Sequence, residues 1–138
     1  MKKPSAFTLI ELMLVVAVVI TLALIAIPSY SKSKNRALQK EAISNLKLIA
    51  AGERIYKMES NSYVGCSCTS AANCANTSNG CNYLLKLMLN TVNWTYSVST
   101  SGGSGCTITA YSSGIGCTYT LNSSGFDTQD YSTSSGCS

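Results

Sequence analysis

Residues 6–28 of the chain read AFTLIELMLVVAVVITLALIAIP, and this stretch decides how the rest of the sequence is interpreted. As a helix, its apolar part Phe7–Ile27 is about 31 Å long, enough to span the hydrocarbon core of a bilayer. A secretory signal peptide also begins with basic residues, like Lys2 and Lys3 here, but the apolar core that follows them is usually only about 7–15 residues long. We therefore predict a membrane-spanning helix.

Glu11 is the only charged residue in this apolar stretch. An ionised side chain inside a membrane costs roughly 2.5–3.5 kcal/mol on insertion scales. Two interpretations are open: the carboxylate lies near the membrane interface, or it awaits a positive partner inside a protein assembly.

Composition changes sharply after the apolar stretch. Residues 31–60 carry most of the charge, whereas residues 61–138 contain 44 Ser, Thr, Asn or Gly and only three charged side chains. The chain has no histidine, which excludes Ser-His and Cys-His nucleophilic sites and every His-liganded metal site. We expect a protein that is not an enzyme and has no cofactor.

The segment Ala6-Phe7-Thr8-Leu9-Ile10-Glu11-Leu12 resembles the N-terminal signal of type IV pilins and of type II secretion pseudopilins. The resemblance implies that a prepilin peptidase cuts between Ala6 and Phe7 and methylates the new Phe7 amine. It also implies that Glu11 pairs with that amine on a neighbouring subunit. Pro28 and Tyr30 match common positions of the family, and Pro28 would supply flexibility during assembly.

The resulting domain organisation has three parts. They are a leader peptide (1–6), a transmembrane or filament-core helix (7–30) and a periplasmic globular domain (31–138), the last divided into a helix (31–60), a Cys-rich loop (61–93), a sheet (94–123) and a tail (124–138). Counting basic residues on either side of the span would instead put the C-terminal part in the cytoplasm. We follow the signal motif and the cysteines, because long domains often cross regardless of charge.

A second helical pattern follows Pro28. Apolar residues recur at intervals of three, four and seven, namely Leu38, Ala42, Leu46, Ile49 and Tyr56. Charged residues are assigned to the remaining surface, namely Lys40, Glu41, Lys47, Glu53 and Lys57. Pro28 has no N–H to donate, so a bend or local melting of the helix is expected there.

The basic group Lys32, Lys34, Arg36 and Lys40 has two interpretations. It forms a solvated face or a contact with lipid headgroups, or it binds nucleic acid. No aromatic residues lie between these basic residues, so the pattern does not favour nucleic acid.

Three segments in the polar half alternate as strands do: Trp94–Thr100, Cys106–Ser112 and Cys117–Asn122. Glycine-rich turns centred on Gly103 and between Gly114 and Ile115 would place Val98 opposite Ile108, and Cys106 opposite Ser123. One face of this sheet is then apolar and needs a cover, which the Leu38–Tyr56 stripe supplies. We predict an α+β fold in which the long N-terminal helix packs on a three- to four-stranded antiparallel sheet, with a short helix at 82–90 in the loop.

The chain has seven cysteines, all after the apolar stretch: Cys66, Cys68, Cys74, Cys81, Cys106, Cys117 and Cys137. This clustering favours disulfides in an oxidising compartment, with one thiol left over. A zinc site at the first four cysteines is the rival, although their spacing is not that of a standard zinc knuckle. Cys106 and Cys117 should not pair, because the hairpin register puts them ~17 Å apart.

The family resemblance adds expectations for the C-terminal tail. Cys137 would close a terminal loop onto Cys106 or Cys117, with the other loop cysteines pairing among themselves. Asp127 and Asp130 loosely resemble a pseudopilin calcium loop, but two carboxylates in a tail are more often only solubilising, and we predict no metal site.

These patterns predict a structural subunit of a type IV pilus-like filament. The expected partners are further copies of the chain, a prepilin peptidase, the inner membrane and a pilus assembly platform. Before assembly the protein would lie in the inner membrane. The alternatives are a pseudopilin of a type II secretion system and a minor pilin acting as an adhesive or DNA-binding tip.

Overall fold

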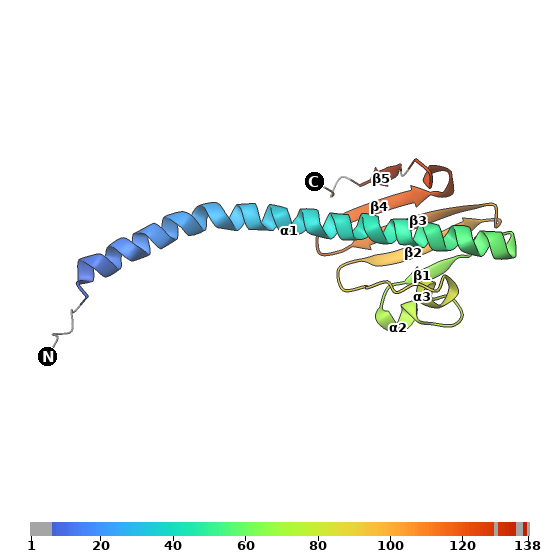
Figure 1. Cartoon of the computed structure of the whole chain (residues 1–138), viewed down its shortest axis with the longest axis horizontal. Helices are drawn as coiled ribbons and strands as arrows, with labels where there is room; N and C mark the ends of the chain where they lie inside the picture. Colours follow the sequence, from blue (N-terminus) through green and yellow to red (C-terminus); the bar gives the residue numbers. More distant parts are fainter. Residues whose placement is uncertain (1–6, 129, 135–136, 138) are drawn as a thin grey trace. The chain divides into compact units, whose positions relative to one another are not determined.

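The computed structural model describes residues 7–128, 130–134 and 137. The chain forms two compact units, Met1–Ala37 and Leu38–Ser138. Helix α1 (Leu9–Ser60) begins in the first unit and ends in the second (Figure 1). Ala6, on the amino side of the predicted cleavage site, and the rest of the predicted leader lie outside the described residues.

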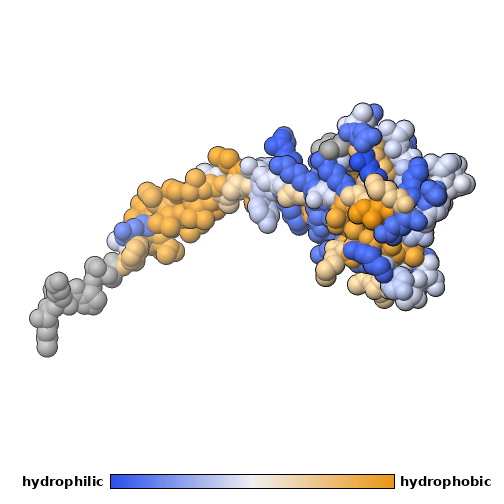
Figure 2. Space-filling model, turned by 45° about the vertical axis from the view of Figure 1, so that its right-hand side comes forward, coloured by the Kyte–Doolittle hydropathy of each residue, from blue (hydrophilic) through white to orange (hydrophobic). Residues whose placement is uncertain are grey.

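In the first unit, α1 is apolar and exposed. Every described residue from Phe7 to Ser33 is exposed, and the visible face of the helix is covered with apolar side chains (Figure 2). The helix runs through Pro28 without a break, so of the bend or local melting predicted there, the local melting is wrong. Proline removes only one hydrogen bond of the helix, and the neighbouring turns remain intact.

In the second unit, α1 lies over one face of the sheet (Figure 1). Its buried residues are Ala42, Leu46, Ile49, Ala50, Gly52 and Glu53. The helix ends where Asn61 adopts a left-handed conformation with φ of 61°. The Asn61 N–H donates to the Lys57 carbonyl at 2.9 Å, and asparagine tolerates this conformation better than most residues.

The sheet has five antiparallel strands in the order β1-β2-β3-β4-β5. The strands are β1 (Cys66–Cys68), β2 (Thr95–Ser101), β3 (Gly105–Ser112), β4 (Cys117–Asn122) and β5 (Tyr131–Thr133). The predicted α+β class is confirmed. The predicted strand count of three to four is wrong, because residues assigned to the loop and the tail add β1 and β5, one at each edge.

The predicted register of the central strands is confirmed. Val98 pairs with Ile108, and the β3–β4 ladder continues to Thr107 opposite Asn122. One step further, the Cys106 N–H donates to Ser123 Oγ at 3.3 Å. The β2–β3 turn is possible because Gly102 and Gly103 have φ values of 59° and 76°.

Two short helices lie in the loop before β2: α2 (Ala71–Cys74) and α3 (Cys81–Leu84). A 3₁₀ turn, η1 (Ser123–Gly125), follows β4. The helix predicted at 82–90 is therefore wrong beyond Leu84. The Asn82 amide accepts from the Leu89 N–H at 2.8 Å and donates to the Leu89 carbonyl at 3.3 Å, and Lys86 turns left-handed with φ of 54°. Asparagine competes in this way with the helix backbone.

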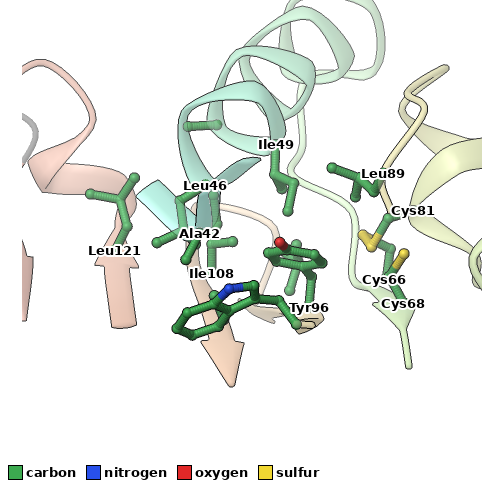
Figure 3. Packing of buried hydrophobic residues seen from close by; sticks show 14 of the residues in the cluster. Ala42, Leu46, Ile49, Cys66, Cys68, Cys81, Leu89, Tyr96, Ile108 and Leu121 are labelled. Carbon is green, nitrogen blue, oxygen red and sulfur yellow. A yellow bond between two sulfur atoms is a disulfide. The ribbon is translucent and has the colours of Figure 1, made fainter. Parts of the chain in front are cut away.

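The core forms between α1 and the apolar face of the sheet. Ala42, Leu46 and Ile49 point toward Tyr96 and Ile108 (Figure 3). The sheet residues predicted for this face are all buried, namely Trp94, Tyr96, Val98, Ile108, Ala110, Tyr119 and Leu121. Placing Glu53 on the solvent face was wrong: it is 0% exposed.

Candidate assembly site

The first candidate region is the apolar part of α1. It contains an 18-residue window with mean hydropathy of 3.0, none of which is buried, so α1 is long and apolar enough to cross a membrane. Leu9, Ile10 and Ile25 are each about three-quarters exposed. A helix that is apolar all round is stable only in lipid or inside a protein assembly.

Glu11 lies in the first turn of this helix. Its backbone N–H donates to the Thr8 side-chain oxygen at 3.3 Å. Thr8 and Glu11 thus form the Thr-x-x-Glu pattern of a capping box, and an acid near a helix N-terminus also interacts favourably with the helix dipole. The Thr-x-x-Glu spacing in the sequence indicates this local role for Glu11, but the predicted site residues omit Thr8.

The other predicted residues of this region have simple environments. Phe7, the residue predicted to be methylated, is 75% exposed. Lys32, Lys34, Arg36 and Lys40 are exposed, and none forms an ion pair with another described residue. These positions are open to lipid headgroups or to other copies.

Three disulfides hold the second unit together. They join Cys66 to Cys81, Cys68 to Cys74 and Cys117 to Cys137. Cys137 therefore pairs with one of the two partners that the sequence left open. The four loop cysteines are bonded to one another, so in this state their sulfur atoms are not available as zinc ligands.

Cys106 is the remaining thiol, and it is buried beside a buried acid. Glu53 accepts from the Val64 N–H at 3.1 Å through Oε2, while its Oε1 has no partner among the described residues. Burial raises the pKa of Glu53 to about 7. Burial and the nearby Glu53 raise the pKa of Cys106 to about 12, so the thiol stays protonated and unreactive.

The spacing of the apolar stripe contains the signal for the burial of Glu53. Leu46, Ile49 and Glu53 are separated by three and four residues, so Glu53 continues the stripe that faces the sheet. Glu53 was assigned to the solvent face because it is charged, although its position in the stripe predicts burial.

Side chains from α1 hold the tail after β4. Arg54 forms an ion pair with Asp127 at 2.6 Å, and its guanidinium lies 5.5 Å from the centre of the Phe126 ring. Phe126 packs edge-on against Tyr63, whose ring lies 4.3 Å from the Lys57 ammonium. Asp127, one of the two acids considered for calcium, is thus engaged by an arginine.

Comparison with known proteins extends this description. The chain is similar to a type IV pilin. It is 46% identical over 57 residues to the type IV major pilin protein PilA of Myxococcus xanthus (strain DK1622). The matched stretch is 41% of this chain and spans about a quarter (26%) of the length of that relative. No family model matches the chain, and no solved structure matches it significantly.

Proposed function

We propose that this protein is a structural subunit of a type IV pilus-like filament. The observation that carries the proposal is the exposed apolar part of α1 (residues 9–27), joined in one chain to a disulfide-bonded α+β unit. Similarity to a protein named as a major pilin supports the same conclusion.

The proposed mechanism begins in the inner membrane, with the disulfide-bonded unit in the periplasm. A prepilin peptidase cleaves between Ala6 and Phe7 and methylates the Phe7 amine. The apolar helix then moves from lipid into a core of like helices with the help of an assembly platform. Its apolar surface stays out of water throughout, so little hydrophobic free energy is lost on transfer.

Glu11 sets the stagger between neighbouring copies in this mechanism. In a dry helical core, an unpaired carboxylate carries a large desolvation penalty. Pairing with the Phe7 amine of a neighbour removes that penalty only when the two copies stand in one register. The same acid is tolerated before assembly because it lies in the first turn of α1, where the helix dipole favours it.

Two measurements on the full chain test the proposal. Intact mass of the membrane-extracted protein should show the loss of residues 1–6 and the gain of one methyl group. Glu11→Ala should insert into the membrane normally but lower the yield of sheared filaments at least tenfold. A chain that keeps Met1, or a Glu11→Ala variant with normal yield, would contradict the proposed mechanism.

Thr8→Ala is the matched control for Glu11→Ala. It removes the side-chain cap at the helix start but keeps the carboxylate. We expect its filament yield to stay within about fivefold of the wild-type yield, because losing one cap costs about 1 kcal/mol, which is about a factor of five in an equilibrium constant. Equal losses in the two variants would assign Glu11 to capping.

A further inference from the structure

The second unit has an apolar groove along α1. The groove has a volume of about 520 Å³ and lies between α1 and residues 83–87. Leu48, Ile55 and Tyr83 line it and are 41%, 59% and 46% exposed. Apolar side chains gather on the surface of this unit (Figure 2). Contiguous apolar patches on a protein surface often mark interaction sites.

The outer face of α1 has the spacing of a helix-packing surface. Leu48, Ala51, Ile55 and Met58 are separated by three, four and three residues, as in a heptad repeat. A second groove, of about 350 Å³, lies on the other side of this ridge and shares Ala51 and Ile55 with the first. The grooves on either side of this ridge are suited to receive protruding side chains of a partner.

The floor of the first groove depends on a glycine. A Cβ atom at Gly52 would lie 3.1 Å from the Leu85 Cβ and 3.4 Å from the Leu87 Cδ1. Glycine therefore lets residues 85–87 approach α1 closely. The close packing of residues 85–87 on α1 at Gly52 therefore shapes the groove.

The same unit also presents an apolar projection. Leu87 lines the groove, whereas the next residue, Met88, is 94% exposed, and Val92 is 80% exposed. The Asn82 side chain holds the backbone of Leu89 between them through two hydrogen bonds. Because the backbone is held in place in this way, the segment loses little backbone conformational entropy on binding.

We propose that the groove between α1 and residues 83–87 receives Met88 and Val92 of a second copy of this chain. This inference rests on the proposed function, because a filament brings copies side by side. Groove and projection are different patches, so the contact is heterologous and repeats from copy to copy, as a filament requires.

The absence of charge favours a second copy as the occupant. Among the residues that line the groove, only Glu59 and Lys86 are charged, and the segment from Leu87 to Phe126 contains no charged residue at all. An uncharged projection thus meets a largely uncharged groove. Two inserted side chains bury much less surface than the about 1,200–2,000 Å² of a stable isolated interface, so the contact acts only together with packing of the apolar helices.

Charge-swap variants of the full chain test the contact. Ile55→Lys and Met88→Glu should each lower the yield of sheared filaments at least tenfold, because each puts an unpaired charge into the contact. The double variant should recover at least half of the wild-type yield, because the two new charges pair across neighbouring copies. Ser44→Lys, at an exposed position of α1 outside the groove, should assemble like the wild type.

A photo-cross-linking residue in place of Met88 gives an independent readout. In intact filaments it should link one copy to the α1 segment around Ile55 of another. Failure of the wild type to form filaments would contradict the proposed function. Wild-type filaments together with undiminished yield in Ile55→Lys, no rescue in the double variant, or cross-links elsewhere would contradict the groove contact alone.

Discussion

Leu22 and Leu46 lie on the same helix but in opposite environments. Leu22 is 64% exposed in the first unit, whereas Leu46 is 0% exposed against the sheet in the second. Near Leu22 the helix is apolar on every side, but near Leu46 only one stripe is apolar. The two parts of one helix therefore differ in their packing. The apolar surface of the first part is left without a partner in the chain, whereas the apolar stripe of the second part packs on the chain's own sheet.

The two units also differ in what holds them. Among the described residues, side-chain hydrogen bonds of the first unit are local, such as Thr21 Oγ1 to the Val18 carbonyl at 2.8 Å. The second unit has three disulfides and contacts between residues distant in sequence, such as Asn45 to the Tyr96 hydroxyl at 2.7 Å. Its fold can therefore be broken while the first unit stays helical.

Reduction of the disulfides should show this difference most strongly. The cross-linked residues are 15, 6 and 20 positions apart. The chain-entropy relation gives about 2–3 kcal/mol for each link, about 8 kcal/mol together, comparable to the whole stability of a domain. In detergent, a reductant should abolish the near-ultraviolet circular dichroism of Trp94 while the apolar helix keeps its far-ultraviolet signal. A folded, fully reduced second unit would contradict this prediction.

Paired leucine truncations should show the next largest effect. Leu46→Ala leaves a cavity between helix and sheet and should lower the free energy of unfolding of the second unit by about 2–5 kcal/mol. Leu22→Ala should change it by less than about 0.5 kcal/mol, because surface positions away from the core contribute little. Denaturant titration followed by Trp94 fluorescence measures both. Equal losses would contradict the separation of the two units.

Glu53 should make the stability of the second unit depend on pH. Its pKa is about 7 in the folded chain and 4.5 ordinarily, so the stabilising contribution of its protonated form is full below pH 4.5 and is lost as the pH rises through 7. Between pH 5 and pH 8 the free energy of unfolding should fall by up to about 3 kcal/mol.

Glu53→Gln should remove most of that slope, because the amide stays neutral throughout. No histidine is present to titrate in the same range. Glu59→Gln changes an exposed acid one turn and a half further along α1 and should keep the slope. An unchanged pH profile in Glu53→Gln would show that another group is responsible.

The smallest expected effect concerns the ion pair between helix and tail. Asp127 is 90% exposed, so Asp127→Asn should lower the stability of the second unit by no more than about 1 kcal/mol. Arg54→Ala should cost more than Asp127→Asn, because the guanidinium also lies over the Phe126 ring. Calorimetric scans at low and high salt distinguish the two contacts, since the exposed ion pair is screened by salt more strongly than the packing of the guanidinium on the ring. Identical losses of stability in the two variants would show that the contact between Arg54 and Phe126 does not contribute.

The sequence predicted the parts of the fold that repeat regularly. Strands β2 to β4 alternate along their length, and glycines mark their turns, so their register followed directly. Strands β1 and β5 have three residues each, too few for an alternating pattern to be visible. The early end of α3 depends on the Asn82 side chain, which reaches a residue seven positions away.

The candidate sites divide in the same way. Glu11 and the apolar stretch stand out in the sequence because one charge interrupts a long uncharged segment. The partner of Cys137 and the groove beside α1 depend on how distant segments meet in space. The spacing of Leu48, Ala51 and Ile55 marks an apolar ridge on α1, but no local pattern identifies the partner of Cys137 or the residues 83–87 that complete the groove.

The two edge strands of the sheet limit unwanted pairing between the sheets of different copies. An open sheet edge offers unpaired backbone groups to any neighbouring strand, and identical chains held close together are the most dangerous neighbours. Here both rims are only three residues long, one carries Cys66 and Cys68, and the other lies just before Cys137. Edge strands of three residues, one of them also cross-linked, leave little backbone for strand addition, and this lowers the tendency of neighbouring copies to pair their sheets.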